Sequence, residues 1–165
     1  MNEVTKAERA ALENVERLDE PHKLKAVIRN ARMKGSKIVE AAAFRRLCLI
    51  QPEASPGTVE HDVWQAIFAL EEMLSMESGK TKRLSRTRQK IAKHGEAKTA
   101  ADLTLRAKPS DGFHMLVERG HPELLFEVVV LRHPKTFDND VRDAARSRLS
   151  EHGIHPEQFE MSEVQ

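Results

Sequence analysis

The stretch that decides the fold is TVEHDVWQAIFALEEMLSM, residues 58–76. Its apolar side chains recur three and four residues apart, which is the spacing of one face of an α-helix. The residues on this face are Val59, Val63, Ile67, Leu70 and Leu74. Thr58 stands directly before the first of them, where a capping hydroxyl is expected. The pattern predicts a long amphipathic helix, and we expect it to be the central helix of the fold.

On both sides of this helix, Gly and Pro divide the chain into segments rich in helix-forming residues. The expected helices cover residues 5–19, 21–35, 36–51, 85–94, 99–106, 110–120, 122–133 and 136–149. Short loops between such helices favour antiparallel neighbours. The sequence therefore predicts an all-α fold of about eight short helices, arranged as an irregular multi-helix bundle or a short stack of antiparallel helical hairpins.

Residues 124–131 have an alternative interpretation as a strand. Three consecutive valines, Val128 to Val130, favour the extended conformation because they are branched at Cβ. A single strand cannot form a sheet, and no second β-branched run of similar strength is available to pair with it. We therefore favour a helix here.

The length of 165 residues suits one domain, which we expect to cover residues 1–153, with a flexible acidic tail over residues 154–165. The uncharged apolar runs are much shorter than the roughly 20 residues that a bilayer span requires, so no membrane partner is expected. Cys48 is the single cysteine and excludes an internal disulfide. Its apolar neighbours indicate a buried core residue. The cysteine usage suits the cytoplasm.

The net charge of +1 conceals blocks of opposite sign along the chain. Residues 21–50 carry +7, residues 51–78 carry −6 and residues 79–108 carry +8. Such blocks can bind a charged partner, or they can pair with one another inside the fold. The sequence leaves both possibilities open.

The densest basic stretch lies at residues 80–94, with seven Lys or Arg in fifteen residues and no acid. On a helix that begins at Ser85, the side chains of Arg86, Lys90 and Lys93 share one face. Their mutual repulsion is relieved when solvent or a row of phosphates screens it. The candidate nucleic-acid-binding residues are Lys80, Lys82, Arg83, Arg86, Arg88, Lys90 and Lys93. Arg88 lies nearer the apolar side of this helix and has an alternative role as the partner of an acid on the helix at residues 58–76.

The aromatic content bears on which nucleic acid such a surface would bind. The chain has no Tyr, one Trp and six Phe, and most of these lie at expected core positions. Stacking on single-stranded bases is therefore less favoured than contact with a duplex backbone. A helix-turn-helix formed with the segment at residues 99–106 is a weaker alternative, because the expected connection is long.

Enzymatic signatures are missing from the sequence. It contains no Gly-rich phosphate loop, serine nucleophile elbow or paired-carboxylate pattern, and its eight histidines do not show the ligand spacing of a zinc site. A magnesium site at Glu71, Glu72 and Glu77 is a minor alternative. We expect a non-enzymatic protein without metal or cofactor.

The leading functional hypothesis is a small nucleic-acid-associated protein whose basic helix at residues 80–94 contacts the phosphate backbone. The alternative is a helical protein-interaction adaptor, or a subunit of a larger assembly, whose acidic and basic faces dock an acidic protein surface or a second copy of the chain.

Overall fold

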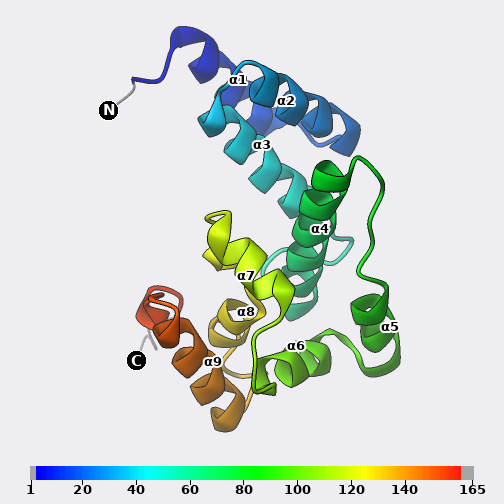
Figure 1. Cartoon of the computed structure of the whole chain (residues 1–165), viewed down its shortest axis with the longest axis vertical. Coiled ribbons are helices and arrows are strands. Elements are labelled where there is room, and N and C mark those ends of the chain that lie inside the picture. The colour runs from blue at the N-terminus through cyan, green and yellow to red at the C-terminus, as the bar shows by residue number, and fades with distance from the viewer. Residues whose placement is uncertain (1–2, 161–165) are drawn as a thin grey trace. The chain divides into compact units, whose positions relative to one another are not determined.

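The computed structural model describes residues 3–160, and it confirms the all-α prediction (Figure 1). Nine α-helices and two short 3-10 helices lie within these residues, which contain no strand. The chain divides into two compact units, residues 1–53 and residues 54–165. A single domain over residues 1–153 stays a prediction.

The first unit contains α1 (Lys6–Arg17), α2 (Pro21–Met33) and α3 (Lys37–Ile50), with α1 and α2 each packed against α3. A complete capping box starts α1: the Thr5 hydroxyl accepts the Glu8 N–H at 3.1 Å, and the Glu8 carboxylate accepts the Thr5 N–H at 2.9 Å. Cys48 is a buried free thiol, so its predicted place in the core is confirmed.

The second unit begins with the helix on which the fold prediction rested. The helix α4 (Val59–Ser78) matches that prediction and starts at Thr58, whose hydroxyl accepts the His61 N–H. It ends at Gly79, whose φ of +70° is the left-handed conformation common after a helix. The other elements are α5 (Ser85–His94), α6 (Glu96–Leu105), α7 (Asp111–Glu118), η1 (Pro122–Leu124), α8 (Phe126–Arg132), α9 (Asn139–Glu151) and η2 (Pro156–Gln158).

The valine run forms the helix α8, so the strand alternative is wrong. Val128, Val129, Val130 and Leu131 are all 2% exposed or less. A helix that is apolar on every side is a buried helix, and α8 packs against α4, α6 and α9. It is shorter than the predicted helix over residues 122–133, because Leu125 is extended, with ψ of 144°, and separates it from η1.

The last described residues pack locally against α9. Residues 156–158 form η2, in which Pro156 is buried, and the Arg146 guanidinium pairs with the Glu160 carboxylate. The predicted tail over residues 154–165 continues into residues 161–165, which lie outside the described part of the chain. Its flexibility stays a prediction.

None of the helices within residues 3–160 combines the length and the apolar character that a membrane span would need.

Candidate nucleic-acid interface

A buried carboxylate on α4 holds the start of the basic stretch. Glu71 is 7% exposed and accepts the backbone N–H of Leu84 at 2.8 Å. The same carboxylate accepts two hydrogen bonds from Arg88, from Nε at 2.7 Å and from Nη2 at 2.6 Å. This two-point geometry is the strong form of an Arg–carboxylate pair. Glu71 therefore fixes both the residue before α5 and the first turns of α5 on α4.

The Arg88 guanidinium also covers two aromatic rings of α4. It lies 5.1 Å from the ring centroid of Trp64 and 5.6 Å from that of Phe68, within cation–π range. The Trp64 indole N–H donates to the Glu96 carboxylate at 3.0 Å. The hydrogen bond from Arg88 to Glu71 raises the pKa of the guanidinium, which stays charged. The prediction that Arg88 pairs with an acid of the 58–76 helix is confirmed.

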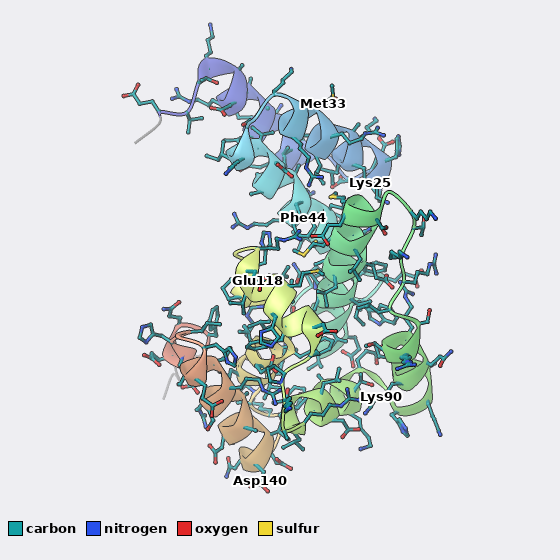
Figure 2. The ribbon with its side chains drawn as sticks, in the orientation of Figure 1. Lys25, Met33, Phe44, Lys90, Glu118 and Asp140 are labelled. Carbon is teal, nitrogen blue, oxygen red and sulfur yellow. The ribbon has the colours of Figure 1, made fainter. Side chains whose placement is uncertain are left out.

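A second residue of the basic stretch is neutralised from α6. Lys90 Nζ lies 3.1 Å from the Asp102 carboxylate, and Lys98 Nζ contacts the same group at 3.2 Å. Figure 2 labels Lys90 where α5 faces α6. The hydrogen bonds from Lys90 and then Lys98 lower the pKa of Asp102 below its ordinary value. Lys90 therefore has an acidic partner inside the unit.

The other five candidate residues remain exposed to solvent, and their side chains form no ion pair within residues 3–160. These residues are Lys80, Lys82, Arg83, Arg86 and Lys93. On α5, Arg86 and Lys93 are two turns apart on the side opposite Ile91, which is the buried residue of this helix. The backbone N–H of Lys82 donates to the Ser75 hydroxyl at 2.9 Å, which ties the approach to α5 onto α4.

At the start of α5, Glu71 accepts the N–H of Leu84, whereas the amides of the first turn have no side-chain cap. The N-cap residue of this helix is Leu84, which offers no side-chain acceptor to the amides of the first turn. Those amides and the helix dipole favour a negative charge at this end of the helix. The exposed cations Lys82, Arg83 and Arg86 flank the same end. Phosphate oxygens match this combination of amides and cations.

The basic block at residues 21–50 belongs to the other unit and is partly neutralised there. Lys23 pairs with Glu20, Arg32 with Glu40, and Arg46 with Asp19. These contacts are internal to residues 1–53.

The structure does not gather the other candidate groups. Gly95 alone joins α5 to α6, which begins at Glu96 instead of the predicted Thr99. This one-residue connection is shorter than the turn of three or four residues that a helix-turn-helix motif has. Of the acids considered for magnesium, Glu71 holds Arg88 and Glu77 pairs with Arg119. Within residues 3–160, no three His, Cys, Asp or Glu side chains form a metal-binding group.

The sequence indicated an acid on the 58–76 helix for Arg88 but not which one, and it did not indicate the contacts of Ser75 and Asp102. Glu71 occupies the buried side of α4 although it is charged, and neither Ser75 nor Asp102 stands in a recognisable motif. The absence of acids from residues 80–94 was the available signal, because a helix that carries Arg88 near its apolar side must find its acid elsewhere in the fold.

Comparison with known proteins returned no match. No family model matches the sequence, and neither a curated protein nor a solved structure gives a significant match.

Proposed function

We propose that this chain is a non-enzymatic nucleic-acid-associated protein that contacts the phosphate backbone of a duplex through its basic stretch. The observation that carries the proposal is the charge that remains on that stretch after internal pairing. Glu71 and Asp102 neutralise Arg88 and Lys90, whereas five exposed cations between residues 80 and 93 keep no acidic partner within the described residues. A surface of this kind gains free energy when it displaces the counterions of a polyphosphate.

The internal pairing divides the seven candidate residues into two roles. Arg88 and Lys90 position α5 on α4 and α6, while Lys80, Lys82, Arg83, Arg86 and Lys93 are available for phosphates. Three to five phosphate contacts predict a slope of about −3 to −4.5 when the logarithm of the binding constant is plotted against that of the salt concentration.

The position of the aromatic residues favours a duplex over a single strand. Trp64 and Phe68 are the aromatic side chains beside α5, and the Arg88 guanidinium lies over both rings. Bases of a single strand bind by stacking on accessible aromatic faces. Because Arg88 occupies these faces, the surface offers backbone contacts without a stacking platform.

The proposal also places the chain in the cytoplasm. Cys48 is a free thiol, as expected in a reducing compartment. The described helices include none that could span a membrane, which agrees with a partner other than lipid.

Fluorescence anisotropy tests the proposal with labelled duplex DNA, duplex RNA and single strands at two salt concentrations. The test variant changes Lys82, Arg86 and Lys93 to Glu, and it omits Lys90 because that residue is paired with Asp102. The control changes Lys6, Lys108 and Lys135 to Glu, which are exposed lysines outside the stretch and produce the same change in net charge.

We expect salt-dependent duplex binding that the test variant loses and the control variant keeps. Helicity measured by circular dichroism should be the same in all three proteins. No binding at low salt, or equal binding by the test and control variants, would show that this surface does not bind nucleic acid.

A further inference from the structure

The first unit carries an open groove of its own. It has a volume of about 420 Å³ and runs between α1 and α2, with α3 contributing to its lining. Its apolar lining residues are Ala7, Ala11, Val27, Ala31 and Val39. The pairs on α1 and α2 are each four residues apart, so both walls follow a helical row. An apolar groove between two helices suits the apolar face of a third helix.

One end of this groove is electropositive. Lys34 lines the groove at this end, and Lys37, the first residue of α3, follows the lining residue Ser36 in the sequence. Both lysines are exposed, and neither forms an ion pair with a described residue. The acid in the lining, Glu8, accepts the Ser36 hydroxyl at 2.6 Å and the Thr5 N–H at 2.9 Å, and its negative charge offsets one of the two lysines.

The start of α3 strengthens this positive end. Ser36 is the N-cap residue, but its hydroxyl donates to Glu8 and makes no capping bond to α3. The first amides of a fourteen-residue helix therefore have no side-chain acceptor, and they favour an incoming carboxylate. Lys34 and Lys37 are close to these amides in the sequence, so the helix end and the two lysines all attract a negatively charged group.

Two large apolar side chains stand exposed at this same turn. Met33, labelled in Figure 2, is 86% exposed at the end of α2, and Ile38 is 44% exposed in the first turn of α3. Neither side chain lines the groove, so they enlarge the exposed apolar surface of this unit outside it.

We propose that this groove docks an acidic amphipathic helix of a partner protein. The apolar face of that helix occupies the groove, and its carboxylates contact Lys34, Lys37 and the start of α3. The proposal concerns residues 1–53 only and does not depend on nucleic-acid binding by residues 80–94.

The test presents the full chain with a displayed library of helices of about 18 residues, or five turns. Positions on one face vary among apolar residues, and the flanking positions are either Glu or Lys in equal input. Selected helices are then measured as labelled peptides against two groove variants, Ala7→Trp and the double change Lys34→Glu with Lys37→Glu. The matched controls are Ala10→Trp and the double change Lys108→Glu with Lys135→Glu, at exposed positions that do not line the groove.

We expect the selection to enrich Glu-flanked helices, and each groove variant to weaken their binding about tenfold, which corresponds to roughly 1.4 kcal/mol. The controls should bind like the unmodified chain. No enrichment, equal enrichment of Lys-flanked helices, or peptide binding that survives both groove variants would overturn the proposal.

Two further measurements test whether something other than a partner helix occupies the groove. Sedimentation that shows a dimer of the chain, dissociated by Ala7→Trp but not by Ala10→Trp, would mean that a second copy fills the groove. Binding to phosphatidylserine vesicles that only the groove variants lose would mean a lipid surface. Either result would overturn the proposed partner helix.

Discussion

Arg88 on α5 and Glu71 on α4 form a two-point ion pair, with Nε 2.7 Å from Oε2 and Nη2 2.6 Å from Oε1. The most basic segment of the chain thus contains a cation whose role is structural. Because the Glu71 carboxylate is buried, its charge depends on Arg88 for compensation. The pair fixes the position from which the neighbouring cations face the solvent.

Replacing Arg88 by Leu should therefore destabilise the fold markedly. The change leaves a buried carboxylate without its cation and removes the guanidinium from the rings of Trp64 and Phe68. We expect the free energy of unfolding to fall by about 2–4 kcal/mol in urea titrations followed by circular dichroism. Changing Glu71 to Leu as well should recover part of this loss. If the double variant is less stable than Arg88→Leu alone, the pair does not compensate the buried charge.

Two lysines one turn apart on α5 should affect nucleic-acid binding unequally. Lys93 is exposed, whereas Lys90 is paired with Asp102. If Lys93 contacts a phosphate, Lys93→Gln reduces the magnitude of the salt slope by about 0.9, and Lys90→Gln reduces it less. Anisotropy at several salt concentrations measures both slopes. A larger effect of Lys90→Gln would show that Lys90 leaves Asp102 and makes the phosphate contact instead.

The buried carboxyl of Glu127 should titrate above its ordinary range. Burial raises its pKa, and the hydrogen bond from Arg148 Nη1 at 2.9 Å opposes the increase only in part. The folded state therefore binds this proton more tightly than the unfolded state does, so Glu127 lowers the stability as the pH rises from the ordinary glutamate pKa through the raised pKa of the folded state. Carbon NMR of the carboxyl should show a raised midpoint, and Arg148→Met should raise it further. A midpoint at or below the ordinary glutamate pKa would mean that pairing outweighs burial.

Gly95 should be intolerant of a side chain for reasons of backbone conformation alone. Its φ of 86° and ψ of 168° lie in a region that is essentially restricted to glycine, and an added Cβ would meet no atom within 4 Å. Gly95→Ala should reduce the free energy of unfolding by about 1–3 kcal/mol in the urea assay. Unchanged stability would show that the junction between α5 and α6 relaxes easily into another conformation.

Sequence patterns were sufficient to predict the helices themselves. The apolar spacing of residues 58–76, the capping residues Thr5 and Thr58, and the Gly and Pro boundaries all act over a few residues, so they can be recognised without the fold. The helical state of Val128 to Val130 was a harder case, because intrinsic propensity favours a strand. The lack of a second strand to pair with was the reason to predict a helix. In the structure, burial on every side of α8 explains why these valines are helical.

The sequence by itself determined the all-α class, the approximate helices and the concentration of positive charge at residues 80–94. Only the tertiary structure decided which of those charges remain available, because Glu71 and Asp102 approach Arg88 and Lys90 across 17 and 12 positions of the chain. The same holds for the groove, whose walls come from α1 and α2 and close around Val39 of α3. Local spacing reports contacts along one helix, whereas ion pairs and grooves between helices depend on how those helices pack.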